Sequence, residues 1–327
     1  RKPMGEERFL ITGALGCIGA WVVRNLVREG VPTTIFDLGD DPHRLKLVLS
    51  DEELSEIRLI RGDITDLESV EAAFQEGDAN RVVHLAAFQV PFCRADPPLG
   101  GRVNVVGTAN VFEAAKRAGL KRVVYASSIL VYGPHQEYPD GPISHDAPAR
   151  PRTHYGVYKQ ANEGTARVYW LDDGLSSIGL RPYVVYGPGR DQGMTSGPTR
   201  AMLAAALGKG YHIPYGGRCD MQFADDVAQT FIRAARIPFE GADAFNLRGS
   251  VVHMREVVAA IEAAEPASRG KISFEDTSLP FPEEADDSPI VELLGSPPYT
   301  PLTEGVAATI AVFRKAIASG RISAGAL

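Results

Sequence analysis

A glycine-rich turn at residues 12–19 constrains the fold of this chain more than any other feature. It reads Thr-Gly-Ala-Leu-Gly-Cys-Ile-Gly and lies between a short apolar segment at 8–12 and an amphipathic segment at 18–29. The apolar segment predicts a strand, and the periodicity of the amphipathic segment predicts a helix. A strand, a glycine-rich turn and a helix in this order indicate a dinucleotide-binding unit.

The three glycines of this turn have distinct physical roles. Gly13 permits the sharp bend, Gly16 lets a pyrophosphate approach the backbone, and Gly19 lets the helix pack closely on the strand. The helix N-terminus adds unpaired N–H groups and a positive potential, which attract phosphate. We therefore assign these glycines, with Cys17 and Ile18, to the cofactor site.

Strand and helix patterns alternate along the rest of the first half. Together with the turn, this alternation predicts an α/β fold: a doubly wound parallel sheet (Rossmann) with a smaller C-terminal substrate lobe. The expected strands lie at 32–37, 57–61, 81–86, 122–127 and 177–183, and the expected helices at 67–75, 104–118 and 155–171.

The alternation loosens further along, where proline-rich segments such as 296–301 indicate loops. We therefore expect a NAD-binding Rossmann domain at 1–186 and a smaller substrate-binding lobe at 187–327. Residues 220–250 are expected to rejoin the Rossmann sheet, because 244–247 has the pattern of a strand.

Composition narrows the classes of partner. The net charge of −7 disfavours a nucleic-acid partner, and no apolar run approaches the ~18–20 residues that a membrane span needs. The polar start at 1–8 lacks the apolar core of a secretory signal, so we expect a cytoplasmic protein. Cys17, Cys93 and Cys219 have no metal-binding spacing, and we expect reduced thiols and no metal site.

An acidic residue at the end of the second expected strand favours NAD as the cofactor. Asp37 can accept hydrogen bonds from the adenosine ribose diol and would repel a 2′-phosphate. Arg44 is close enough in sequence to keep NADP open as an alternative. Asp63, which precedes Ile64, either meets the adenine amino group or caps a helix.

Tyr155 and Lys159 lie four residues apart on one expected helix, so both side chains project from the same face. A tyrosine has an ordinary pKa of about 10 and is a poor base at neutral pH. A neighbouring ammonium and the positive nicotinamide ring favour the phenolate. We expect Tyr155 to accept a proton from a substrate hydroxyl, and Lys159 to hold the nicotinamide ribose.

These features together resemble the extended short-chain dehydrogenase/reductase family, which contains nucleotide-sugar epimerases and dehydratases. Many members of that family pair as homodimers through two helices, which here would be 104–118 and 155–171. The segments that carry the resemblance are 12–19, Asp37, 62–64, 84–87, 104–110, 127–133, Tyr155, Lys159 and 181–188.

The resemblance also implies roles for single residues. Leu85, Ala86 and Ala87 would line the adenosine and nicotinamide-ribose side of the cofactor site, with Pro182 and Ile64 as further cofactor contacts. Asn104 would help to order the active site.

Ser128 matches the substrate-binding hydroxyl of the family and would stabilise charge on the reacting oxygen. Ser127 is one residue away and would point to the other side of a strand. His84 ends a buried strand, where a structural histidine is favoured over a catalytic one.

Two departures from the family's patterns limit the reaction. Relatives that dehydrate nucleotide sugars carry Thr-Asp-Glu where this chain has Ser-Ile-Leu at 128–130, so a 4,6-dehydratase is not expected. Nucleotide-sugar epimerases hold the diphosphate with arginines, but Cys219 stands at one such position, with Arg218 displaced by one residue. Near the second expected arginine position, the acidic segment 282–287 would repel a diphosphate.

We therefore expect a small substrate: a free sugar, sugar acid, polyol or other secondary alcohol. A dehydrogenase that releases NADH is the first interpretation, and an epimerase that retains NADH is the alternative. A non-catalytic dinucleotide sensor or scaffold is the rival from another class. Arg94, Arg190 and Arg200, in expected substrate walls at 89–94 and 188–200, could each bind a carboxylate or be surface residues.

Overall fold

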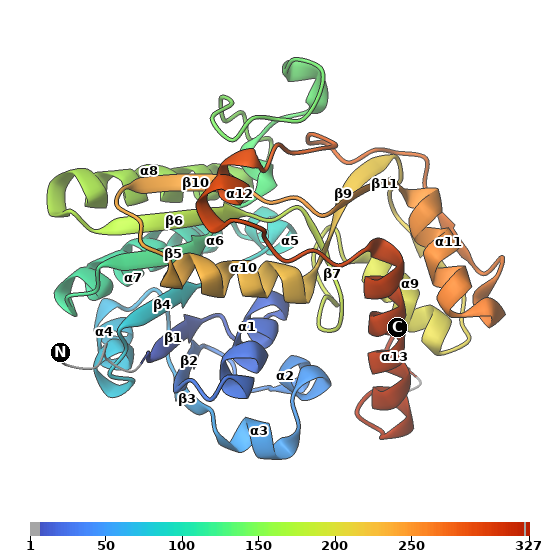
Figure 1. Cartoon of the computed structure of the whole chain (residues 1–327), viewed down its shortest axis with the longest axis horizontal. Coiled ribbons are helices and arrows are strands. Elements are labelled where there is room, and N and C mark those ends of the chain that lie inside the picture. The colour runs from blue at the N-terminus through green and yellow to red at the C-terminus, as the bar shows by residue number, and fades with distance from the viewer. Residues whose placement is uncertain (1–6, 324) are drawn as a thin grey trace.

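A seven-stranded parallel sheet forms the centre of the molecule (Figure 1). The computed structural model describes residues 7–323 and 325–327, so most of the polar start that suggested a cytoplasmic location lies outside the described residues. The order β10-β6-β5-β4-β1-β2-β3 confirms the doubly wound fold. The strands are β1 (Phe9–Thr12), β2 (Thr33–Asp37), β3 (Arg58–Arg61), β4 (Arg81–His84), β5 (Arg122–Ala126), β6 (Ser176–Arg181) and β10 (Ala242–Asn246).

Helices cover both faces of this sheet, because both faces of its central strands are apolar. Successive residues of β1 alternate between two hydrophobic cores: Phe9 and Ile11 belong to one, and Leu10 to the other. The helices α1 (Cys17–Arg28) and α10 (Ala224–Arg236) contribute to the first core, and α4 (Leu67–Glu76), α7 (Gly107–Arg117) and α8 (His154–Asp173) to the second.

The second part of the chain builds two small sheets beside the main one. One contains β7 (Val184–Tyr186), β9 (Arg218–Phe223) and β11 (Ser250–His253), and the other pairs β8 (Tyr211–Ile213) with β12 (Ile272–Phe274). Figure 1 shows α9, α11 and α13 together on the side of the molecule away from β3 and α4. The helices of this part are α9 (Gly197–Ala206), α11 (Met254–Ala264), α12 (Ser288–Leu294) and α13 (Leu302–Ala318).

The chain crosses between the two parts more than once. Within 220–250, β10 joins the main sheet and α10 packs against that sheet. Most of β9 and the first residue of β11 lie in the small sheet that also contains β7. The expected strand at 177–183 ends at Arg181, because Pro182 cannot donate a hydrogen bond to a sheet. A division into two domains stays a prediction.

Short helices make up most of the remaining regular structure, and a π-helical segment replaces the start of the helix expected at 104–118. No helix of the described residues is long and apolar enough to cross a membrane. These short elements are α2 (His43–Val48), α3 (Asp51–Ser55), α5 (Val90–Ala95), α6 (Pro97–Gly101), the π-helix η1 (Arg102–Val106), and the 3-10 helices η2 (Ile129–Val131), η3 (His135–Glu137) and η4 (Pro266–Ser268).

Candidate active site

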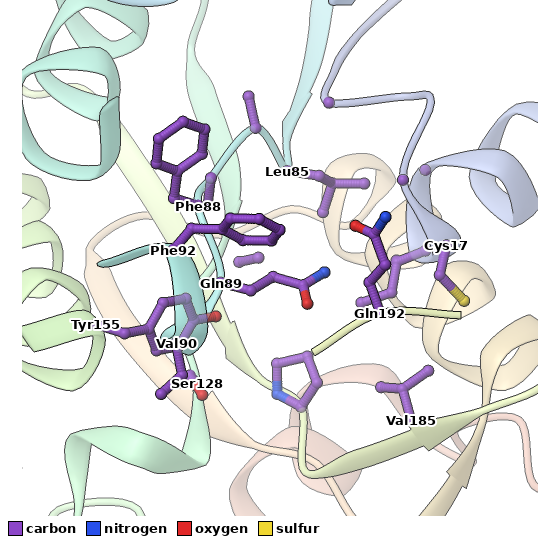
Figure 2. Close-up of a pocket in the computed structure, with 18 of the residues that line it drawn as sticks. Cys17, Leu85, Phe88, Gln89, Val90, Phe92, Ser128, Tyr155, Val185 and Gln192 are labelled. Atoms are coloured by element: carbon purple, nitrogen blue, oxygen red, sulfur yellow. The ribbon is translucent and has the colours of Figure 1, made fainter. Parts of the chain in front are cut away.

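A cavity of about 460 Å³ lies at the carboxyl ends of the parallel strands (Figure 2). It includes the junction between β1 and β4, where the strand order reverses and ligands of such sheets bind. Every sequence-predicted cofactor residue lines this cavity, and so does Ser128, whereas Asn104 does not. The predicted cofactor residues in its wall are Gly13, Gly16, Cys17, Ile18, Gly19, Asp37, Asp63, Ile64, Leu85, Ala86, Ala87, Tyr155, Lys159 and Pro182.

Two glycines of the turn are required by close backbone contacts. Gly13 has a φ of +70°, and a Cβ there would lie 2.5 Å from the backbone nitrogen of Ala86. A Cβ at Gly19 would lie 2.6 Å from the Cα of Ala14. Both distances are too short for any side chain, so the turn can adopt this shape only with glycine at these positions.

The N-terminus of α1 faces the cavity with free donors. Its first backbone hydrogen bond runs from the N–H of Ala20 to the carbonyl of Gly16, and no side chain caps the helix. The N–H groups of residues 17–19 therefore have no partner within the helix. Free N–H groups at a helix N-terminus fit the pyrophosphate of a dinucleotide.

The far end of the cavity carries the carboxylate of Asp37. Its Oδ2 accepts a hydrogen bond from the N–H of Leu15 at 3.1 Å. Arg44 is not available to bind a 2′-phosphate, because its guanidinium pairs with Asp191 at 2.8 Å and donates to the carbonyl of Leu15. Asp63 accepts hydrogen bonds from its neighbour Thr65, which is the local turn-capping role.

Removing the charge of Asp37 should weaken the preference for NAD. In Asp37→Asn, we expect the ratio of kcat/KM for NAD to that for NADP to fall roughly tenfold, because one carboxylate–phosphate repulsion is lost. Asp40→Asn is the matched control, since Asp40 pairs with Arg61 outside the cavity wall. An unchanged ratio in Asp37→Asn, measured by initial rates, would contradict the role given to Asp37.

Tyr155 and Lys159 stand at the other end of the cavity, on the first turns of α8. Thr153 caps this helix by accepting a hydrogen bond from the N–H of Gly156 at 3.0 Å. Ser128 lines the same part of the cavity and acts to lower the pKa of Tyr155. The Lys159 Nζ lies 5.4 Å from the centre of the Tyr155 ring and donates to the carbonyl of Ala126 at 2.6 Å.

Burial is the largest cause of the pKa shifts of both Tyr155 and Lys159. It raises the pKa of Tyr155 to about 12, against which the Arg190 guanidinium has the largest lowering effect, followed by the polar Ser128 side chain. Burial also lowers the pKa of Lys159 to about 8. In the protein without ligand, the cation that most lowers the pKa of Tyr155 is therefore Arg190, whereas the sequence had suggested Lys159.

Asn104 acts behind the cavity wall. Its side chain accepts from the N–H of Phe88 at 2.7 Å and donates to the carbonyl of the same residue at 2.9 Å. Asn104 is fully buried within the π-helical segment. It thus holds the loop that carries Phe88 and Gln89 into the cavity, and π-helical turns often occur at such sites.

His84 belongs to a buried hydrogen-bond chain. The Thr108 hydroxyl donates to the carbonyl of Asn104 at 2.7 Å, so His84 Nε2 must donate to Thr108 at 2.9 Å. His84 Nδ1 then accepts from Thr12 at 2.6 Å, in the strand before the phosphate turn. Because burial lowers the pKa of His84 to about 3, the ring is neutral and links β1 to the π-helix.

Neither of the two positions at which a diphosphate-binding arginine was expected places an arginine in the cavity wall. Cys219 is fully buried in the hydrophobic core. Arg218 is exposed and pairs with Glu284, a member of the acidic segment. Neither residue lines the cavity.

Tyr183, Phe281 and Pro282 form an aromatic lid on the same side of the cavity. The Tyr183 hydroxyl donates to the carbonyl of Pro282, and Phe281 packs edge-on against the Tyr183 ring at 5.2 Å. Phe281 is buried, and both rings line the cavity.

The three candidate arginines have different surroundings. Arg94 is exposed on α5 and lies outside the cavity wall. Arg200 lies over the ring of Tyr211 at 5.5 Å, also outside the wall. Arg190 alone among the three lines the cavity.

Sequence reasoning missed two kinds of residue. Phe88, which lies between the 84–87 segment and the expected wall at 89–94, lines the cavity and was not singled out. Glu163 forms a buried ion pair with Arg181 behind the site at 2.7 Å. Its position one helical turn after Lys159 was an available signal, because it places Glu163 on the same helix face.

The sequence pattern of the NAD dependent epimerase/dehydratase family matches residues 9–247. The chain belongs to this family. It is an NAD-dependent epimerase or dehydrogenase of the extended short-chain dehydrogenase/reductase type, and NAD is its cofactor. It is therefore an enzyme and not a non-catalytic sensor.

Individual relatives cover nearly the whole chain. A UDP-glucose 4-epimerase of Mycolicibacterium smegmatis is 32% identical over 317 residues, which are 94% of this chain and 98% of that protein. The structure of a Thermus thermophilus UDP-glucose 4-epimerase in complex with NAD has 27% identity and a TM-score of 0.79, covering 95% and 100% of the two chains. An L-threonine dehydrogenase of Clostridium difficile has a TM-score of 0.80 at 20% identity, covering 97% and 99%, which is a likeness of fold alone.

Proposed function

We propose that this enzyme is a NAD-dependent dehydrogenase that oxidises a secondary hydroxyl of a small sugar, sugar acid or polyol. The observation that carries the proposal is the burial of Cys219 where nucleotide-sugar enzymes of the family place a diphosphate-binding arginine. The neighbouring Arg218 is exposed outside the cavity wall, 3.5 Å from Glu284, and Glu284 pairs more closely with Arg248. A diphosphate entering this side of the cavity would find no cation from either residue.

The lid formed by Tyr183, Phe281 and Pro282 supports a small substrate as well. A nucleotide bound on this side would have to displace a buried aromatic ring and break the hydrogen bond from the Tyr183 hydroxyl. Burying Phe281 contributes about 2 kcal/mol of apolar transfer energy, which opening of the lid would lose. A compact alcohol needs no such opening.

The chemistry follows from the two hydroxyls at the end of the cavity opposite Asp37. Ser128 and Tyr155 both bind the reacting oxygen, and the Tyr155 phenolate accepts its proton. Lys159, held by the carbonyl of Ala126, adds positive charge beside the phenol ring. NAD, when bound, supplies the acceptor for the hydride that leaves the substrate carbon. The turn at 13–19 and Asp37 would hold its pyrophosphate and adenosine ribose.

An epimerase of a UDP-sugar is the second candidate function. It is favoured by relatives that match over nearly the whole chain, such as the M. smegmatis UDP-glucose 4-epimerase. The same Tyr155 and Ser128 would serve it, since epimerisation begins with the same oxidation.

A substrate panel separates the two candidates. Free sugars, aldonates, uronates, alditols and UDP-sugars are incubated with the enzyme and NAD, with NADH absorbance and product stereochemistry both recorded. The proposal predicts stoichiometric NADH release with a substrate that lacks a nucleotide. Turnover of UDP-glucose to its 4-epimer without NADH release would establish the second candidate instead.

We also propose that two copies pair through α8. Val157, Val168 and Leu171 are exposed at positions that repeat along one face of this helix, and Leu171 is 70% exposed. Val106, in the adjoining π-helix, is exposed as well. Exposed apolar side chains that share one helix face are typical of an interface. Location in the cytoplasm stays a prediction of the sequence.

Light scattering after size-exclusion chromatography tests this pairing. The wild type should have twice the mass of one chain, and Val168→Asp should have the mass of one chain because a buried charge opposes association. Leu59→Asp is the control, since Leu59 is exposed on β3, at the opposite edge of the main sheet from the strands that α8 contacts, and this variant should stay dimeric. A monomeric wild type would contradict the pairing.

A further inference from the structure

Arg190 is a cation in the cavity wall without a counterion. Its Nη2 donates to the Thr195 hydroxyl at 3.0 Å, and its Nε is buried with no hydrogen-bond partner. The adjacent carboxylate of Asp191 is engaged by Arg44 and His43. Among the described residues, no carboxylate forms an ion pair with Arg190.

A second unpartnered polar atom lies beside this guanidinium. Gln89 Oε1 is buried and accepts no hydrogen bond within the described residues. A Cβ built at Gly193 would lie 2.2 Å from Gln89 Oε1 and 3.2 Å from Arg190 Nη2, so both side chains pack against this glycine. Gly193 has a φ of +97°, and any side chain here would be strained and would fill the space between the two groups.

The two groups lie within reach of the reacting end of the cavity. Figure 2 shows Gln89 projecting into the cavity, with Tyr155 and Ser128 on one side and Gln192 and Cys17 on the other. The charge of Arg190 also lowers the pKa of Tyr155 more than any other group does. A ligand held by Arg190 and Gln89 can therefore present a neighbouring hydroxyl to Tyr155.

Physical chemistry specifies the partner that these groups lack. A partly buried guanidinium without a counterion loses hydration and gains nothing in return, unless an anion enters the site. Its planar donors match a carboxylate, which accepts two parallel hydrogen bonds. A buried amide oxygen without a donor needs an N–H or O–H group, and a hydroxyl near the carboxylate supplies one.

We propose that Arg190 binds a carboxylate of the substrate while Gln89 accepts a hydrogen bond from an adjacent hydroxyl, so the substrate is a hydroxy acid. This inference rests on the proposed function, and it selects the sugar acid from the three substrate classes given there.

The pyrophosphate of NAD is the other source of anionic oxygens in this cavity. The charge of Arg190 also acts on Cys17 in the phosphate turn, where it opposes the burial that raises the pKa of that thiol. The free N–H groups of α1 are available to bind the pyrophosphate. Among the described residues of the cavity wall, no cation other than Arg190 lies beside Gln89 without an ion-pair partner. The experiment must nevertheless separate the two sources.

The test uses substrate pairs that differ in one carboxylate: D-glucuronate with D-glucose, D-galacturonate with D-galactose, and D-galactonate with galactitol. NADH formation gives kcat and KM, and calorimetry gives the affinity of the enzyme for NAD and of the NAD-loaded enzyme for each acid. The variants are Arg190→Met, Arg190→Lys and the control Arg94→Met, which changes an exposed arginine outside the wall.

We expect turnover of an acid and not of its neutral partner. Arg190→Met should lower kcat/KM for the acid about 100-fold, raising KM because one partner of a charge pair is removed and lowering kcat because the cation that most lowers the pKa of Tyr155 is lost. Arg190→Lys should recover part of this loss, Arg94→Met should resemble the wild type, and NAD affinity should not change in any variant.

Three results would overturn the inference: equal turnover of neutral and acidic partners, parallel loss of NAD affinity in Arg190→Met, or neither binding nor turnover of any acid. Turnover of free neutral sugars would remove the carboxylate site and leave the proposed function intact. Turnover of UDP-sugars alone would remove the proposed function itself.

Discussion

Replacing Tyr155 with phenylalanine should lower turnover at least about 100-fold, the usual scale for loss of a general acid or base. The hydroxyl removed is the group that accepts the substrate proton in the proposed reaction. Because the ring itself remains, packing on α8 is preserved. Steady-state kinetics with the substrate identified by the panel measures the effect.

The pH profile provides the control for this variant. Burial raises the pKa of Tyr155 to about 12 in the protein without ligand, so the phenolate is a minor species at neutral pH. Oxidation by the wild type should therefore accelerate as pH rises, and Tyr155→Phe should lose this dependence while binding NAD normally. Turnover close to that of the wild type would remove Tyr155 as the base.

Replacing Glu163 with alanine should destabilise the protein by about 3–5 kcal/mol, the usual cost of leaving a buried charge unpaired. The side chains of Glu163 and Arg181 are only 17% and 8% exposed and lie 2.7 Å apart. Arg181 also donates to the Tyr132 hydroxyl and to Asn246, so this cation joins α8, β6 and β10. Urea denaturation measures the free energy of unfolding.

The double variant Glu163→Ala/Arg181→Met tests the cause of that loss. If the unpaired charge is responsible, removing Arg181 as well should restore part of the stability lost in Glu163→Ala. Additive losses in the double-mutant cycle would show that the two side chains act independently. They would contradict the role of this ion pair in fastening α8 to the sheet.

The cofactor half of the site was predictable because its determinants are local. Gly13, Gly16 and Gly19 must follow one another between a strand and a helix, and Asp37 must end the next strand. Tyr155 and Lys159 share a helix face because of the period of the helix alone. Sequence spacing carries this information without knowledge of any long-range contact.

The substrate half was not predictable to the same degree, because its residues meet only through tertiary contacts. Arg94, Arg190 and Arg200 were equivalent in sequence, and the path of the loop after β7 brings only Arg190 into the cavity wall. Asn104 was expected to order the site. Its hydrogen bonds to the backbone of Phe88 depend on a π-helical turn that no local sequence pattern predicts.

The order of the outer strands shows the same limit. A strand near 244–247 was expected to rejoin the main sheet, and β10 pairs with β6 at its edge. Alternation alone could not predict that β7 and β9 form another sheet, since the residues of both strands are largely buried, as those of the main sheet are.

The crystal structure of the enzyme in complex with NAD is the most direct test of the central claim. The account predicts that the nicotinamide lies beside Tyr155 and Ser128, with the pyrophosphate at the N-terminus of α1 and the adenosine ribose at Asp37. A nicotinamide placed away from the Tyr155 hydroxyl, with the substrate carbon unable to lie between them, would contradict it.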